Sequence, residues 1–372
     1  MLVNFNHKEK TLNVNQNISF INNTSKKLDT LYLSDWSNSY SSIKTPLAQR
    51  FGEEYDRSFF LSKKSKLGNT KINYIGGQDK ELKWGRLKNQ PDILWVILEK
   101  PLKVDEIYKL NLVYVIKIPD AKFNRYGYDQ EGNIFLRNWH IILNQHQKGK
   151  WLNYSNLDLD DLNPIPAKYQ VKVYGQDQFQ TDLNLKLVKQ ENQVQHFQGT
   201  DVKELILSLS VEDQFESFVT DTENTIVTDV FRKVNKDEAK RIINTIDDFI
   251  GEKFIYKRNK KYLVPKLMYE KNPFFGLNDL PDFLTPFDID FLAEISYLKA
   301  FLHFYLNSNT NFDLRKNHWI IGGLQTYLII KYIEKFHPNQ KFIGRIGDFK
   351  IMKGYNIADI NFNESFFMFY EL

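Results

Sequence analysis

The sequence predicts a multidomain α+β protein, with an antiparallel β region first and a region of mixed helices and strands after it. Two observations predict this. Up to about residue 228, short segments rich in Val, Ile, Leu and Tyr alternate in polarity between clusters of turn residues. From about Asn235 onward, apolar residues recur with the period of a helix. We therefore expect one domain over residues 1–228 and a second over residues 229–372.

The first region is expected to form sandwich-like antiparallel sheets, because its strand patterns follow one another without an intervening helical period. Clusters of Asn, Asp and Gly with the chemistry of turns separate the strands. Residues 45–54 are an exception and predict a short helix or a loop excursion. The expected strands cover residues 11–20, 31–33, 93–98, 110–118, 169–174 and 205–211.

The second region begins with a helix that Asn235 caps and Gly251 ends, and acidic residues in its first turn suit the helix dipole. A strand over residues 261–267 and a loop rich in Pro, Gly and Asn follow. Two further helices, 288–306 and 319–336, are joined by a polar loop. Both are apolar over more than half of their circumference, which predicts core helices.

Composition excludes several classes of function. The 50 Lys and Arg residues are nearly balanced by 46 Asp and Glu residues, and the basic residues are scattered, so no nucleic-acid partner is expected. The absence of cysteine excludes disulfides, thiolate metal sites and cysteine nucleophiles. We expect no transmembrane segment, because no run approaches about 18 apolar residues. No signal peptide is visible after Met1, and both ends suggest a piece of a longer protein.

The block from Tyr262 to Tyr332 contains a strand, a GLNDL loop at residues 276–280, a helix and a WIIGGLQTY helix start at 319–327. This order resembles the aminopeptidase N and leukotriene hydrolase family of zinc metallopeptidases, the gluzincins. That family has a Gly-x-Met-Glu-Asn loop, an HExxH helix, a gap of eighteen residues and a Trp-Leu-Asn-Glu-Gly helix. The resemblance implies an N-terminal β saddle domain. It also implies that residues 229–372 are the first part of a thermolysin-like α/β domain that continues beyond Leu372.

The family's zinc site can be carried over position by position. Two His residues four apart on one helix bind the metal, the Glu beside the first is the general base, and a Glu on the second helix is the third ligand. In this chain the motif has become KAFLH, with Lys299 at the first His, Ala300 at the base and His303 at the second His. Eighteen residues later, Gly322 stands at the Glu position.

This replacement argues against hydrolysis. A charged Lys299 has no lone pair for zinc and repels the dication, and a single imidazole does not hold zinc against water. We therefore predict no intact catalytic residue, no bound metal and no other cofactor, with His303 as the only retained ligand position. On its own, His303 is expected to be a hydrogen-bonded structural residue of a core helix.

The resemblance assigns a substrate cleft to Gly276, Asn278, Asp279 and Tyr327. Asp279 stands where the family has the Glu that grips the free amino terminus of the substrate, and it is one methylene shorter. A plainer interpretation is also open, in which Asp279 caps a turn and Trp319 and Tyr327 pack between the two helices.

Three hypotheses follow from the sequence. The first is a non-catalytic pseudopeptidase that binds a peptide, protein or envelope component; the relatives it resembles are often exported in bacteria, which suggests the envelope or periplasm. The second is an active metallopeptidase in which His303 acts with Asp313, Glu294 or His318. The third is an accidental resemblance, with a β-sandwich joined to a helical binding module. The oligomeric state stays open.

Overall fold

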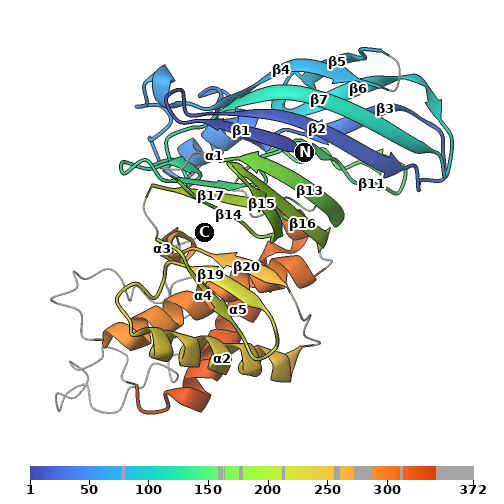
Figure 1. Ribbon diagram of the computed structural model, residues 1–372. Helices are drawn as coiled ribbons and strands as arrows, with labels where there is room; N and C mark the ends of the chain where they lie inside the picture. The colour runs from blue at the N-terminus through green and yellow to red at the C-terminus, as the bar shows by residue number, and fades with distance from the viewer. Residues whose placement is uncertain are drawn as a thin grey trace. The chain divides into compact units, whose positions relative to one another are not determined.

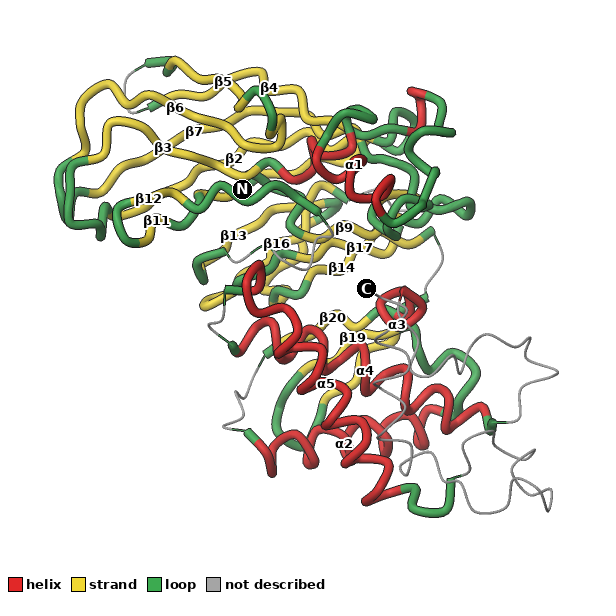
Figure 2. Tube along the Cα trace, turned by 180° about the vertical axis from the view of Figure 1, so that it is seen from behind, coloured by secondary structure: helices red, strands yellow, loops and turns green. Residues whose placement is uncertain are grey.

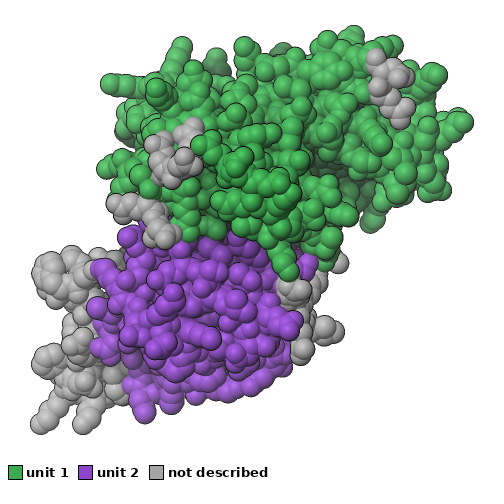
Figure 3. All heavy atoms as spheres, in the orientation of Figure 1, with its two compact units in different colours: residues 1–213, 312–316 green, residues 214–311, 317–372 purple. Residues whose placement is uncertain are grey.

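The computed structural model describes residues 1–77, 80–157, 162, 164–175, 179–211, 214–254, 260–271, 287–310 and 313–340. A large β-sheet region comes first and helices follow, so the predicted α+β class is confirmed (Figures 1 and 2). The chain divides into two compact units, which Figure 3 colours separately. Unit 1 contains residues 1–213 and 312–316, and unit 2 contains residues 214–311 and 317–372.

The largest sheet of unit 1 has seven strands in the order β15-β16-β13-β1-β2-β7-β4 (Figure 1). Its neighbours pair antiparallel, except that β1 and β13 run parallel. The expectation of purely antiparallel sheets is wrong at this pair, because no hairpin dictates the direction in which two strands distant in sequence meet. The strands are β1 Leu2–Asn6, β2 Thr11–Ile21, β4 Asn69–Gly76, β7 Ile107–Lys117, β13 Ala167–Tyr174, β15 Lys186–Glu191 and β16 Val194–Val202.

Two four-stranded sheets and a small hairpin complete the β structure of unit 1. One sheet has the order β10-β3-β6-β5 and the other β14-β17-β9-β8, while β11 pairs with β12. Every strand predicted from the sequence coincides with an observed strand. The bounds are β3 Leu28–Ser34, β5 Lys83–Leu87, β6 Gln90–Leu102, β8 Gly127–Tyr128, β9 Ile134–Arg137, β10 Ile142–Leu143, β11 His146–Gln147, β12 Lys150–Trp151, β14 Gln180–Leu183 and β17 Ile206–Ser210.

The excursion predicted at residues 45–54 is helix α1, Pro46–Glu53. Thr45 caps it, because its hydroxyl oxygen accepts a hydrogen bond from the Ala48 N–H at 3.3 Å, and a proline suits the first helical position. Two short 3₁₀ turns lie on either side of it in the chain, η1 Trp36–Tyr40 and η2 Lys64–Lys66.

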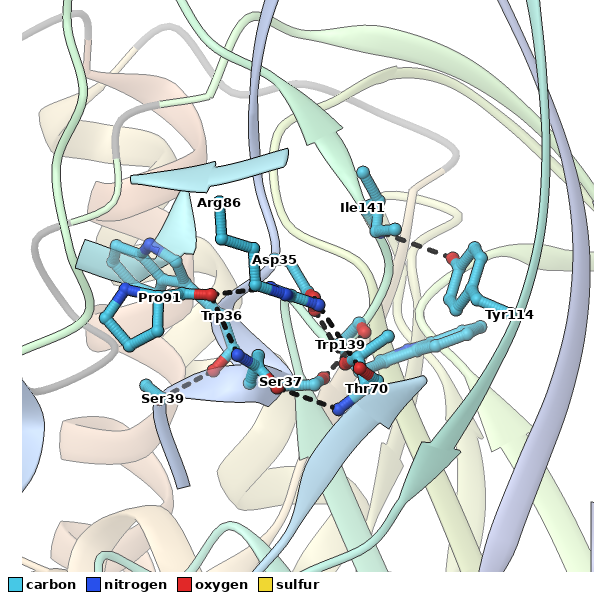
Figure 4. A network of polar contacts seen from close by, with 11 residues as sticks. Asp35, Trp36, Ser37, Ser39, Thr70, Arg86, Pro91, Tyr114, Trp139 and Ile141 are labelled. Atoms are coloured by element: carbon cyan, nitrogen blue, oxygen red, sulfur yellow. Dashed lines mark hydrogen bonds and ion pairs between the residues drawn. The ribbon is translucent and has the colours of Figure 1, made fainter. Parts of the chain in front are cut away.

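A buried polar network holds the η1 turn against the neighbouring strands (Figure 4). Asp35 is only 1% exposed, and its carboxylate lies 2.7 Å from the Arg86 guanidinium and accepts a second bond of 2.7 Å from the Thr70 hydroxyl. Arg86 also donates to the Pro91 carbonyl at 2.5 Å. Because each charged group is paired and hydrogen-bonded, the network avoids the penalty of an isolated buried charge.

Two other buried groups of unit 1 have displaced pKa values. Burial raises the pKa of Asp92 to about 6, although the Asn156 N–H and the Ser155 hydroxyl stabilise its charged form. Burial lowers the pKa of His140 to about 3, and its Nε2 lies 3.0 Å from the Tyr169 hydroxyl. These groups make the stability of unit 1 depend on pH.

Unit 2 is built on a three-stranded sheet in the order β18-β19-β20. Strands β18, Glu216–Val219, and β19, Thr225–Thr228, form a hairpin, and β19 pairs parallel with β20, Lys261–Val264. Helix α2, Lys236–Lys253, connects β19 to β20. Because β19 pairs with β20, the hairpin lies in unit 2, which begins at residue 214.

The start of α2 agrees with the prediction and its end does not. The Asn235 side chain accepts a hydrogen bond from the Asp237 N–H at 2.9 Å, which is the expected cap. Gly251 lies inside the helix, and the backbone becomes extended only at Phe254. Strand β20 is also shorter than predicted, because helix α3, Lys266–Lys271, begins directly after Pro265.

The two long helices are α4, Ile289–Asn309, which lies in unit 2, and α5, Leu314–Phe336, which belongs to unit 2 from Asn317 onward. Helix α4 is buried around most of its circumference, as predicted. Helix α5 begins at Leu314 and not at the predicted residue 319. At its start the Asp313 carboxylate accepts a hydrogen bond of 3.2 Å from the Arg315 N–H. The backbone of α5 is non-helical at Asn317. Among the described helices, none is long and apolar enough to cross a membrane.

Candidate functional site on helices α4 and α5

Helix α4 carries three of the four positions that the resemblance assigns to the zinc motif. Lys299 and His303 are four residues apart and therefore lie on the same side of the helix, and both are half-buried. Ala300 is 1% exposed and packs in the core. His303 Nε2 lies 3.2 Å from the Asn307 side-chain amide, and its ring meets Phe304 edge-on at 5.3 Å. His303 is thus hydrogen-bonded within its own helix, as expected of a structural histidine.

Two hydrogen bonds join helix α5 to helix α4. Gln325 donates a hydrogen bond of 2.7 Å to the Lys299 carbonyl, and further along α5 the Tyr332 hydroxyl donates to the Glu294 carboxylate. Gly322 lies three residues before Gln325 on α5. The meeting of Gly322 with Lys299 and His303 stays a prediction.

Among the described residues, none crowds the third-ligand position. A Cβ atom built on Gly322 would have no atom of the described residues within 4 Å outside its own helix backbone, and the same holds at the next residue, Gly323. Packing therefore does not compel a glycine there. Gln325, three residues further along the same side of α5, ties the two helices together where the family has its metal ligands.

Sequence reasoning missed Gln325 and a buried cluster at the other end of the helix pair. Glu294 is 6% exposed, accepts a bond from Tyr332 and lies 3.1 Å from His337 Nε2. Gln325 follows Gly322 by three residues, so its place on the same side of α5 could have been predicted from helical spacing. The contacts of Glu294 with Tyr332 and His337 could not, because they depend on how two separate segments pack.

The residues present do not fit a catalytic zinc ion. Among the described residues, no three His, Asp or Glu side chains are grouped so that they could hold a metal. Glu294 lies nine residues before His303 on α4, about 13 Å along the axis, and therefore does not share an ion with it. Lys299 brings a positive charge to the site of the first ligand, which opposes a dication.

The cleft residues implied by the resemblance are only partly visible. Gly276, Asn278 and Asp279 lie outside the described residues. Tyr327 is 56% exposed, with the Lys331 ammonium 5.9 Å from its ring centroid, and Trp319 is 74% exposed. The expectation that these two aromatics pack between the helices is wrong, because both side chains are largely exposed. The role of Tyr327 in ligand binding stays a prediction.

Comparison with known proteins agrees with this architecture. No protein-family model matches the sequence, and no curated protein matches it. Among solved structures, an M1 zinc metallopeptidase from Deinococcus radiodurans superposes with a TM-score of 0.51 at 12% identity, over 90% of this chain and 68% of that one. A mutant of that enzyme bound to a Tyr-Ser-Ala substrate gives a TM-score of 0.51 at 13% identity, over 90% and 69%.

The chain therefore has the fold of the M1 zinc metallopeptidases. The resemblance inferred from residues 262–332 is confirmed as a likeness of fold, and it extends over 90% of the chain. At this level of identity the likeness concerns the fold alone, and the chemistry must be argued from the residues at the site.

Proposed function

We propose that this protein is a non-catalytic relative of the M1 metallopeptidases, which binds a peptide, protein or envelope component without hydrolysing it. One observation carries the proposal: the likeness to the M1 fold extends over 90% of the chain, while three of the four positions that the resemblance assigns to the zinc chemistry hold unsuitable residues. A base is absent at Ala300, a ligand is absent at Gly322, and a cation stands at Lys299.

The changes remove separate parts of the chemistry. Zinc hydrolases need three protein ligands and an open position for water, together with a group that takes the proton from that water. His303 supplies one ligand, and its Nε2 faces the Asn307 amide. The methyl group of Ala300 takes no proton. Restoring any one of these residues would leave the other changes in place. A single substitution is therefore not expected to restore activity.

A peptide is the ligand class that we favour. The related mutant structure holds a Tyr-Ser-Ala substrate, and the predicted cleft keeps an acid, Asp279, at the position that grips the amino terminus of the substrate in the resembled family. A carboxylate that meets an α-ammonium forms a charge-assisted hydrogen bond, which does not need the metal. The domain boundary at residues 228/229, the thermolysin-like character of the second domain and an exported location belong to the same proposal.

The first test measures metal and activity on the whole chain. After purification and dialysis against micromolar zinc, we expect less than about 0.1 zinc per chain, because stable sites use three or four ligands. We also expect no hydrolysis of leucine p-nitroanilide above a blank without protein. Stoichiometric zinc together with hydrolysis of that substrate would refute the proposal and support an active enzyme with different ligands.

The second test measures binding by calorimetry, with Tyr-Ser-Ala and its N-acetylated form as ligands. We expect a dissociation constant in the micromolar to millimolar range for the free peptide and weaker binding for the acetylated one. Asp279→Asn should weaken binding about tenfold, since it removes the charge that meets the ammonium. Asp290→Asn, an exposed acid at the start of α4, is the matched control and should change nothing. Equal affinity of both peptides for all three proteins would contradict a peptide-terminus site.

A further inference from the structure

The seven-stranded sheet of unit 1 has one face that is open to solvent and unusually rich in amides. Along β2, the inward residues Leu12, Val14 and Gln16 are buried, while the alternate residues Asn13, Asn15 and Asn17 are exposed. The sheet register places Asn13 opposite Asn4 of β1 and Asn17 opposite Asn111 of β7. The asparagines therefore form neighbouring rows across the middle of the sheet rather than isolated surface residues.

A shallow hollow of about 220 Å³ lies on this face. Asn4, Asn13, Asn15 and Asn73 supply amide groups around it, and Leu2, Val113 and Val115 supply aliphatic surface. Tyr174, which is 41% exposed, stands at one side. The hollow itself is lined mainly by apolar surface, to which the asparagines on the same face of the sheet add a smaller polar part.

The same sheet is strongly biased in charge. Its seven strands contain seven lysines and only two acids, Glu191 and Asp201, whereas the whole chain has 50 basic and 46 acidic residues. Lys172 of β13 pairs in register with Leu2, and Lys71 of β4 pairs with Val115. The two lysines therefore flank the hollow from opposite sides, four strands apart, which corresponds to about 19 Å.

We propose that this sheet face binds an acidic polysaccharide. An asparagine amide donates and accepts at once, which matches the paired hydroxyl groups of a sugar. The aliphatic floor suits the C–H face of a sugar ring, and the flanking ammonium groups suit carboxylate or sulfate groups. Because the cations stand about 19 Å apart on an open face, an extended polymer meets both at once while a single sugar does not.

The composition of the face favours a glycan over other polyanions. None of the seven strands contains an arginine, the residue that recognises phosphate through a planar pair of donors. Single-stranded nucleic acids bind through rows of aromatic side chains on which the bases stack. Of the two aromatic residues that line the hollow, Tyr174 is exposed, whereas Tyr114 is only 1% exposed and is not available for stacking. The sheet face belongs to unit 1 alone, and its binding does not depend on whether the helices of unit 2 hold zinc.

The test measures binding of the whole chain to immobilised polymers by biolayer interferometry. Polygalacturonate and heparin are the carboxylated and sulfated probes, amylose is the neutral comparator and poly(dT) represents nucleic acid. We expect binding to at least one acidic polysaccharide that weakens with added salt, and no binding to amylose. The stronger of the two acidic probes identifies the preferred anionic group.

Two double variants locate the site. Lys71→Gln/Lys172→Gln should weaken binding about tenfold, and Asn13→Ala/Asn15→Ala should weaken it by a similar factor without changing the salt dependence. All four positions are exposed, so thermal unfolding should stay close to that of the unmodified protein. The matched control, Lys27→Gln/Lys44→Gln, removes the same charge from exposed loops elsewhere in unit 1 and should bind normally.

Three outcomes would overturn the proposal. These are failure of both acidic polysaccharides to bind, equal binding by the control and the two sheet variants, or tighter binding to poly(dT) than to either polysaccharide at the same salt concentration.

Discussion

Replacing Gly322 by alanine tests directly whether the third-ligand position is open. Glycine inside a helix is destabilising because its backbone loses the most freedom on folding. Within the part of the chain that the structure describes, the Cβ atom of an alanine at position 322 would have no atom within 4 Å outside the helix backbone, so no clash with a described residue offsets the gain. The substitution should therefore stabilise unit 2.

The magnitude follows from helix propensity. Alanine is about 0.8–1.0 kcal/mol more favourable than glycine in a helix interior, and no buried surface is added in the open space. For a unit of this size, about 1 kcal/mol corresponds to a rise of about 2–4 °C in the unfolding temperature. Gly322→Glu should retain most of this gain, because glutamate is also a good helix former.

Urea unfolding and calorimetry measure the change, with Gly251→Ala in α2 as the matched control. A Cβ atom at Gly251 also has no neighbour within 4 Å, so this variant should be stabilised as well, although its position near the helix end reduces the gain. If Gly322→Ala lowers the free energy of unfolding by 1 kcal/mol or more while Gly251→Ala raises it, then position 322 is packed in solution and the open site is refuted.

Three further predictions concern pH and metal. Burial raises the pKa of Asp92 from 3.8 to about 6, so its stabilising contribution is present below about pH 4 and is lost as pH rises through 6. In the unmodified protein the free energy of unfolding should therefore fall by about 3 kcal/mol between pH 4 and pH 7, as measured by urea titration. This fall should be absent in Asp92→Asn. His140 acts in the opposite sense: burial, and then the charge of the amino terminus, lowers its pKa from 6.5 to about 3, so stability present above pH 6.5 is lost on acidification. His140→Gln should abolish up to about 5 kcal/mol of that loss, and an unchanged acid limb would contradict the assignment. Finally, Lys299→His/Gly322→Glu would give His303 two partners in register, so zinc content measured by mass spectrometry should rise to about one per chain; a folded double variant that retains no zinc would show that the helix register does not support the site.

Local sequence was sufficient for much of the framework. Each strand predicted in unit 1 coincides with an observed one, Asn235 caps α2, and α4 was recognised from its apolar pattern. These features depend on alternation, capping and periodicity, which act between residues a few positions apart. Boundaries that depend on a competing neighbour were less accurate, as Pro265 shows by ending β20 before α3 begins.

The candidate site divides in the same way. The identities at the motif positions could be counted along the chain, because the family's metal ligands have a fixed spacing within and between the two helices. Whether those positions meet in space depends on how α4 packs against α5, for which the Gln325–Lys299 hydrogen bond is one point of contact. Helical spacing describes one helix at a time and carries no information about the register between two.

By itself, then, the sequence determined which residues stand at the positions that the resemblance assigns to the zinc ligands and the base, since identity and spacing can be counted along the chain. Only the tertiary structure decided that β1 pairs parallel with β13, that Trp319 is exposed and that no described residue crowds Gly322. Each of these depends on contacts between residues far apart in the chain or on their absence. Burial and strand pairing depend on the tertiary structure, whereas the functional groups of a side chain are known as soon as the residue is identified.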